Sequence, residues 1–432
     1  MTDVTLFDAA PSVPPPLPPA PPPLPANGVA FNGIEGTFWR LLTRGAALLL
    51  VTLGIYRFWL QTDVRRFLWN NTEIAGDHLE YIGTARELLL GFLVAIAFLV
   101  PLYAIFYLGA FAAGWIGQFA SLIALFVLAL LGQFAVYRAR RYRLSRTVYR
   151  GIRFHQGGSA WRYAICAIFW WGMIGMTLGL AYPWAQASLE RFKLRNTYYG
   201  DLRGEFTGSG TRLFFRGILM WLVVVAPLVL GMMVALGGVD WTALGEALSR
   251  GGKDAMSRAE AAGAAWAAAF ALISISWSVI AIAALYPAFQ AMVLRWWISG
   301  LRFGELSATS HLRTGAVYGL YWRFVWMSLL AGLAVTVVAG IAGGVVYGIS
   351  LAAGASASRE LLQGAILIGV YVIAALAYST IYQATVKLRL WRQGFESAEL
   401  ANVAVLDRVK AAPASGSPVG EGFADALHVG GI

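Results

Sequence analysis

Three polar residue types recur in this sequence at one constant spacing of 125 positions. The pairs are Arg66 and Arg191, Asn71 and Asn196, and Glu80 and Glu205. A guanidinium binds phosphate or carboxylate oxygens through two parallel hydrogen bonds, and a side-chain amide can satisfy backbone or ligand groups nearby. A carboxylate beside aromatic neighbours can titrate or pair with an arginine. The combination favours recognition of an anionic head group or solute over covalent chemistry.

These residues belong to a longer repeat without gaps. Residues 52–88 and 177–213 share twelve identities at this spacing, beginning with Thr-Leu-Gly in both copies. Arg295 aligns with Arg191 in a more diverged copy, 104 residues further along. Because the repeat lies between apolar segments, it indicates that a membrane unit was duplicated.

The composition places the chain in a membrane. Hydrophobic residues make up 59% of it and charged residues 13%, whereas soluble domains carry about 45–50% and about 25%. Six segments with almost no charge are long enough to cross a bilayer, which takes about 20 residues. They are approximately 88–108, 115–137, 216–237, 264–289, 324–348 and 362–386. We therefore predict an all-α, polytopic integral membrane protein with internal repeats.

Two shorter segments, 41–56 and 163–182, leave the topology open. They are copies of each other, so both cross the membrane or both enter and return. The length of 163–182 favours two crossings, which would make three-helix units with inverted topology. The basic loops favour re-entry: residues 138–162 hold eight arginines and no acid, and basic loops collect in the cytoplasm.

The repeated block allows two interpretations. In the first it is an elbow at the membrane surface, and its aromatic residues anchor each helix pair at the level of the lipid head groups. These anchors are Trp59, Trp184, Phe67 and Phe192. In the second, the polar residues also bind a ligand, and Arg66, Arg191 and Arg295 line one cavity.

No catalytic or metal-binding pattern is apparent. The four histidines share no spacing typical of metal ligands, and no phosphate-binding glycine loop is present. Glu80 and Glu205 are either solvated loop acids or partners of the repeated arginines; a lipid enzyme that uses them is the remotest alternative. We expect no cofactor, no metal, no enzymatic activity and no nucleic-acid partner. The expected partner is the bilayer, including anionic head groups.

The chain divides by composition into five parts. Residues 1–30 are a proline-rich arm, expected to be extended and disordered. Two membrane repeat units follow at 31–153 and 154–304, and then a helical hairpin at 305–395. Residues 396–432 are expected to form a flexible tail.

The repeat resembles a known family. The run Thr-Leu-Gly-Ile-Tyr-x-x-Trp through Asn-Asn-Thr at 52–72, with Tyr81-x-Gly83 after it, is similar to the YjgN-like bacterial inner-membrane proteins, a domain of unknown function. The similarity extends over roughly 31–395. It implies a multi-pass protein of the bacterial inner membrane and supplies no reaction or ligand.

The function that we expect is non-enzymatic: binding or translocating a small solute or lipid at the cytoplasmic membrane. The alternative is a structural or assembly protein without a small-molecule ligand. A cavity lined by the repeated arginines would favour the first function.

Overall fold

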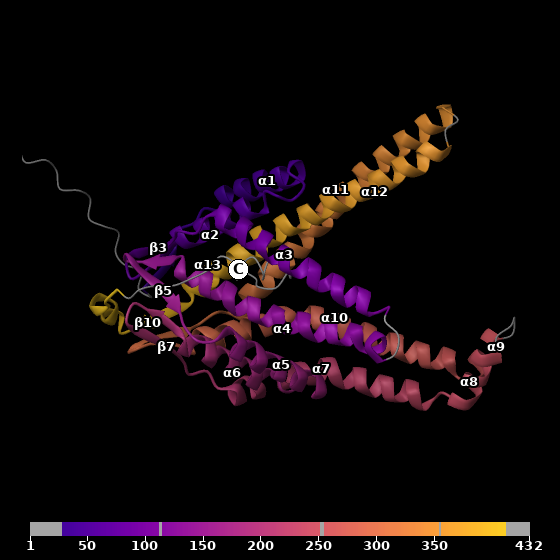
Figure 1. Ribbon diagram of the computed structural model, residues 1–432, viewed down its shortest axis with the longest axis horizontal. Coiled ribbons are helices and arrows are strands. Elements are labelled where there is room, and N and C mark those ends of the chain that lie inside the picture. The colour runs from indigo at the N-terminus through magenta and orange to yellow at the C-terminus, as the bar shows by residue number, and fades with distance from the viewer. Residues whose placement is uncertain (1–27, 112–114, 251–254, 354–355, 412–432) are drawn as a thin grey trace, which may run out of the picture.

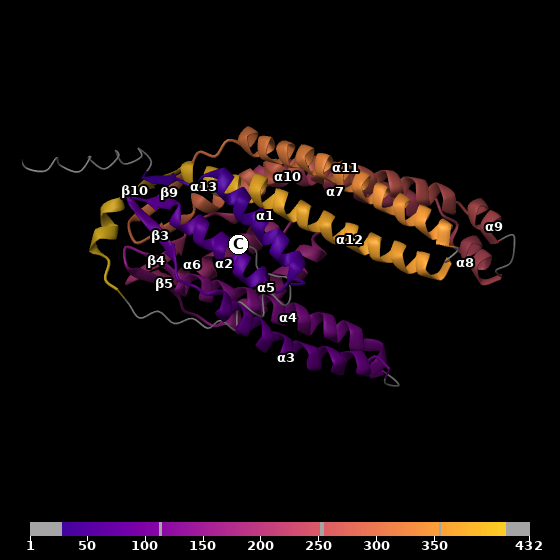
Figure 2. The same cartoon turned by 90° about the horizontal axis from the view of Figure 1, so that it is seen from above.

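Ten short antiparallel strands form a ring at one end of the molecule, and five helical hairpins extend from it (Figures 1 and 2). The computed structural model describes residues 28–111, 115–250, 255–353 and 356–411. Each strand pairs with its neighbours in chain order, and β1 and β10 also contact each other, so the ring is almost closed. The expectation of a purely α-helical fold is therefore wrong in this respect.

The strands are three to five residues long. They are β1 (Val29–Phe31), β2 (Thr72–Ile74), β3 (Asp77–Tyr81), β4 (Thr147–Tyr149), β5 (Ile152–Gln156), β6 (Thr197–Tyr199), β7 (Leu202–Phe206), β8 (Leu301–Phe303), β9 (Leu306–Ser310) and β10 (Ala398–Ala401). Two residues join β2 to β3 and β4 to β5, and both residues of each turn have positive φ. That conformation suits a tight hairpin between twisted strands.

The helices fill the intervals between the strand pairs. In chain order they are α1 (Glu35–Val51), α2 (Arg57–Asn70), α3 (Ala85–Gly109), α4 (Trp115–Ser145), α5 (Ala160–Met176), α6 (Tyr182–Arg195), α7 (Gly210–Gly237), α8 (Trp241–Arg250), α9 (Ala255–Ala261), α10 (Ala264–Ile298), α11 (Thr314–Ala353), α12 (Ser356–Tyr382) and α13 (Leu388–Glu396). A π-helical turn, η1 (Gln383–Lys387), joins α12 to α13, and a 3₁₀ helix, η2 (Val403–Arg408), follows β10.

Six helices in the described part of the chain have the length and apolarity to cross a membrane, which confirms the six predicted segments. They are Ala85–Gly109, Phe119–Ser145, Gly210–Gly237, Ala264–Ile298, Thr314–Ile349 and Leu361–Glu396. Most of their side chains are not buried within the protein. Such a surface is stable against lipid tails rather than water.

Each of the two short segments forms a helix that turns back toward the strand ring. Helix α5 packs against α6, and β5, which precedes them, pairs with β6, which follows them. Both ends of this hairpin therefore lie at the ring, and the same holds for α1 and α2 between β1 and β2. This arrangement favours the return of both segments over two crossings with inverted repeats.

The repeated Thr-Leu-Gly forms the turn of each short hairpin. The Thr52 hydroxyl donates to the Leu48 carbonyl oxygen (2.7 Å) and accepts from the Tyr56 N–H (3.0 Å). Thr177 makes the same two bonds with Met173 and Ala181. The following Leu and Gly have φ of 49° and 93° in both copies. The threonine thus caps the end of one helix and the start of the next, which reverses the chain.

The five-part division needs three corrections. Strand β1 begins at Val29, inside the arm placed at 1–30, and the boundary at 153 cuts β5. Residues 398–408 form β10 and η2, so this part of the 396–432 segment is folded. Residues 1–27 and 412–432 lie outside the described residues.

Candidate functional site

The repeated arginines hold the strand hairpins onto the helix ends. Arg66 donates to the Gly83 carbonyl oxygen (3.0 Å), and Arg191 donates to the Gly208 carbonyl oxygen (3.1 Å). Arg295 instead donates to the Thr314 hydroxyl (3.2 Å). The three arginines lie on three different hairpins. The structure does not bring them together around one cavity.

The repeated asparagines satisfy helix ends. The side-chain amides of Asn71 and Asn196 each donate to the carbonyl oxygen four residues earlier, at 2.7 Å. Thr72 and Thr197 do the same with their hydroxyls. Because the last carbonyls of a helix have no partner within it, these bonds end α2 and α6 cleanly before the strands begin.

Glu80 and Glu205 occupy exposed positions on the outer face of the ring. In β3 the residues on either side of Glu80 are buried, and in β7 the same is true of Glu205. Side chains alternate between the two faces of a strand, so both carboxylates point away from the interior. They fit solvated acids.

The four predicted anchors behave in two ways. Trp59 and Trp184 are exposed, as head-group anchors would be. Phe67 packs against Phe38 with ring centres 5.0 Å apart, and Phe192 packs against Tyr137 at 5.7 Å. These two phenylalanines are partly buried and pack against core clusters, so they offer less surface to head groups than the two tryptophans do.

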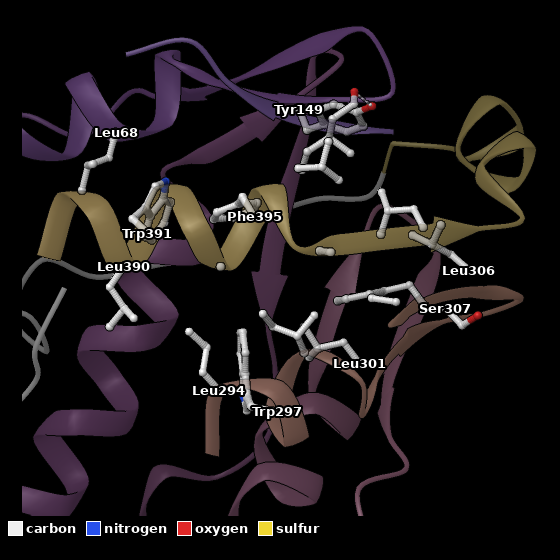
Figure 3. Close-up of a pocket in the computed structure, with 18 of the residues that line it drawn as sticks. Leu68, Tyr149, Leu294, Trp297, Leu301, Leu306, Ser307, Leu390, Trp391 and Phe395 are labelled. Atoms are coloured by element: carbon white, nitrogen blue, oxygen red, sulfur yellow. Dashed lines mark hydrogen bonds between the residues drawn. The ribbon is translucent and has the colours of Figure 1, made fainter. Parts of the chain in front are cut away.

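An apolar cavity of about 650 Å³ lies between the inner face of the ring and helices α10 and α13. We call it the ring chamber. In Figure 3, Leu294 and Trp297 of α10 lie across it from α13 and the strands. Its other labelled lining residues are Leu68, Tyr149, Leu301, Leu306, Ser307, Leu390, Trp391 and Phe395. Pockets of this size and character take small apolar ligands.

Polar groups gather at one side of the ring chamber. Gln290, Tyr382 and Lys387 belong to its lining, and the Tyr321 hydroxyl donates to the Gln290 side chain. The Lys387 ammonium lies 5.9 Å from the centre of the Tyr382 ring. Lys387 ends the π-helical turn, and such turns are frequent at functional sites. The arrangement offers a cation to an otherwise apolar ligand.

The segment after β10 covers the side of the ring away from the helices. Leu406 packs with Leu79, Tyr149 and Tyr199 inside the ring. Arg150, in the β4–β5 turn, bonds Asp407 at 2.6 Å and also bonds Asp77. The backbones of Asp201 and Lys410 bond as well, with 3.1 Å between the Asp201 nitrogen and the Lys410 oxygen. The hairpin turns thus hold this cover in place.

A buried ion pair supports the chamber wall. Glu190 of α6 is 7% exposed; it pairs with Lys193 and accepts from the Trp297 indole N–H at 3.0 Å. Arg140 lies 3.9 Å away. Burial alone would raise the pKa of the Glu190 carboxyl, but the nearby positive charges outweigh burial and hold that pKa below its ordinary value. Trp297 is therefore fixed by a charged partner.

The tyrosines of the ring interior are also held by hydrogen bonds. The Tyr199 hydroxyl donates to the Tyr149 carbonyl oxygen (3.1 Å), and the Tyr149 hydroxyl donates to the Ile74 carbonyl oxygen (2.8 Å). Burial raises the pKa of Tyr199 to about 12, so both donors stay protonated at neutral pH. No group of His, Cys, Asp and Glu in the described residues could hold a metal ion.

The repeat did not identify the chamber residues. Lys387 stands at the end of the last apolar segment, where it reads as an ordinary basic flank. The strands left a weak signal, the Ala-Gly and Arg-Gly turns at 75–76 and 150–151, which precede alternating residues. Only pairing between distant strands encloses the chamber.

The fold and the site define a polytopic membrane protein whose helical hairpins stand on a strand ring with an apolar chamber. The family described as a bacterial protein of unknown function, DUF898, matches residues 26–272, more than half of the chain. The protein belongs to this family, which is the YjgN-like family that its repeat resembles. Neither the curated proteins nor the solved structures contain a match.

Proposed function

We propose that this protein binds an amphiphile, a molecule with one apolar chain and an acidic head group, in the ring chamber. The main support for this proposal is that Lys387 lies at the polar side of the otherwise apolar ring chamber. Lys387 is half-buried in the cavity lining, and taking a charge out of water is costly unless an opposite charge lies beside it. An acidic head group would neutralise Lys387 while the apolar lining takes the chain.

The location suits such a ligand. The ring lies where the membrane helices end, so the chamber is within reach of molecules dissolved in the bilayer. Arginine-rich loops surround the ring, which supports an orientation with the ring in the cytoplasm of the bacterial cell, at the inner membrane. The proposal concerns binding, and transport across the membrane is not required.

The test measures binding of oleate and of oleyl alcohol to the full-length protein in amphipol, by displacement of a fluorescent fatty acid. We expect Lys387→Met to weaken oleate binding about tenfold, the loss of one charge-assisted hydrogen bond. The same change should leave oleyl alcohol binding unaltered, and Lys387→Arg should retain the preference for oleate.

A second variant obstructs the chamber. A Cβ atom at Gly394 would lie 3.5 Å from the Leu294 side chain, an ordinary contact distance, and we expect the rest of the side chain in Gly394→Leu to extend into the space. Gly369→Leu is the matched control, because Gly369 lies on α12 with open space around it. Gly394→Leu should weaken binding of both probes. Equal binding by both leucine variants would contradict the proposal and favour the alternative, a structural protein with no ligand.

A further inference from the structure

A second cavity, of about 710 Å³, lies outside the ring where α7 begins and α10 ends. Four arginines line it: Arg212, Arg216, Arg295 and Arg302. Residues with hydroxyl groups also line it, together with Met292, Trp296 and two glycines, and no Asp or Glu is among the described residues that form it. We call it the arginine pocket. Its polarity is opposite to that of the ring chamber.

Three elements bring these arginines together. Arg212 and Arg216 are one turn apart on α7 and so share a face. Arg295 comes from the last turn of α10, where its bond to Thr314 holds it in position. Arg302 comes from β8, which also contributes to the ring chamber. Glu205 stands opposite Arg302 in the β7–β8 register but is not part of the lining.

The pocket is shaped before any ligand arrives. A Cβ atom at Gly300 would lie 2.4 Å from the Phe206 ring, so no larger residue fits there. The Trp296 indole N–H donates to the Ser209 carbonyl oxygen (3.0 Å), and the Thr207 N–H donates to the Gly300 carbonyl oxygen (2.9 Å). These bonds fix the start of α7 against the end of α10.

The corresponding place at the base of α3 and α4 is filled by the chain itself. There the Ile82 N–H donates to the Arg146 carbonyl oxygen (2.9 Å), as Thr207 does to Gly300. The Arg146 guanidinium bonds the Glu87 carboxylate at 2.9 and 3.1 Å. An internal anion and an arginine occupy the space that stays open at the arginine pocket.

At α7 and α10, different residue types stand at the positions that correspond to Glu87 and Arg146. Glu87 is the third residue after Thr84, which caps α3, and the third residue after the cap Ser209 of α7 is Arg212. The counterpart of Arg146 is Gly300. At the arginine pocket, therefore, a cation stands where α3 has an anion, and a glycine leaves the space of the second arginine side chain open. Four arginines around a cavity whose lining holds no carboxylate create a positive potential that attracts an anion from outside.

We propose that the arginine pocket binds a phosphate group. Arginine forks match the oxygens of phosphate, and the first N–H groups of α7 add partial positive charge at the same point. Arg212 and Arg216 lie in the first two turns of a membrane helix, which is the level of lipid head groups. The phosphate belongs either to an anionic lipid or to a phosphorylated solute.

The test measures binding of three probes to the full-length protein in amphipol by calorimetry: short-chain phosphatidylglycerol, glycerol 3-phosphate and inorganic phosphate. Arg212→Glu restores the internal carboxylate, and we expect it to weaken binding about tenfold or more. Tight binding of the lipid alone assigns the pocket to a head group. Comparable binding of the two soluble phosphates assigns it to a solute.

Arg162→Glu is the matched control. Arg162 holds the same place after the cap Ser159 of α5, with the same 3.4 Å bond from its N–H to the serine hydroxyl. The Arg162→Glu variant should bind phosphate as the wild type does, and both variants should unfold at the wild-type temperature. No binding of any probe, or an equal loss in both variants, would overturn the inference. Arg212→Glu should still bind oleate as the wild type does. That result would show that the ring chamber is intact and that the loss is confined to the arginine pocket.

Discussion

The Arg392 guanidinium donates a hydrogen bond to the Gly33 carbonyl oxygen at 2.7 Å, and this contact joins α13 to the segment between β1 and α1. Arg389, one turn earlier on α13, bonds Glu35 at 2.7 Å. Together with the contact between β1 and β10, these bonds complete a ring whose other neighbours are consecutive in the chain.

Opening this junction should destabilise the whole ring. We expect Arg392→Ala to lower the free energy of unfolding by about 1.5–3 kcal/mol, the value of a hydrogen bond from a charged group. Thermal unfolding in detergent would measure the loss. Arg313→Ala, a change at an exposed arginine of the 311–313 loop, is the control. Equal stability of the two variants would mean that the junction does not hold the ring.

Trp277 of α10 compensates for a proline in α7. Pro227 has no N–H, so it cannot bond the Val223 carbonyl oxygen, and the Trp277 indole N–H donates to that oxygen instead at 3.0 Å. Trp277→Phe should cost about 1–3 kcal/mol, because it leaves a carbonyl without a donor in lipid.

Pro227→Ala provides the check on this explanation. It restores the N–H, so Trp277→Phe should cost clearly less in that background than in the wild type. A double-mutant cycle of unfolding free energies measures the difference. Strict additivity of the two changes would show that the tryptophan stabilises α7 by packing alone.

The return of the short hairpins can be tested by labelling. In a Cys166→Ala background, cysteines at exposed positions 153 and 203 precede and follow the α5–α6 hairpin. An impermeant maleimide should label both from the same side of the membrane. A cysteine at position 249, on α8 at the far tip of a long hairpin, should react from the other side. Labelling of 153 and 203 from opposite sides would mean that α5 crosses.

The Glu190 ion pair makes stability depend on pH. The pKa of Glu190 is lower in the folded protein than its ordinary value of 4.5, so its stabilising contribution is present above about pH 4.5 and is lost as the pH falls through the folded value. At neutral pH, Glu190→Gln should cost about 3–5 kcal/mol, because Lys193 then lies buried without its partner.

On acidification, the difference between wild type and Glu190→Gln should shrink. Unfolding temperatures of both proteins at neutral pH and below pH 4.5 would measure it. A difference that stays constant over this range would show that the carboxylate charge does not stabilise the fold.

Part of this protein was open to prediction because the determining interactions are local. Apolar length alone marks the six membrane helices, since a bilayer imposes a fixed thickness. Thr52 and Thr177 bond residues only four positions away, so the identical triplet forms the identical turn. The aligned Asn71 and Asn196 likewise end α2 and α6 in the same way.

The tertiary structure decided the rest. The strands are three to five residues long, too short for a periodic signal, and they exist because each pairs with a segment beyond a helical hairpin. That pairing encloses the ring chamber and places Arg302 beside Arg212, which are 90 residues apart. By itself the sequence determined the membrane helices and their turns. Contacts between distant segments determined where a ligand fits, because a cavity is a property of the surfaces that meet around it.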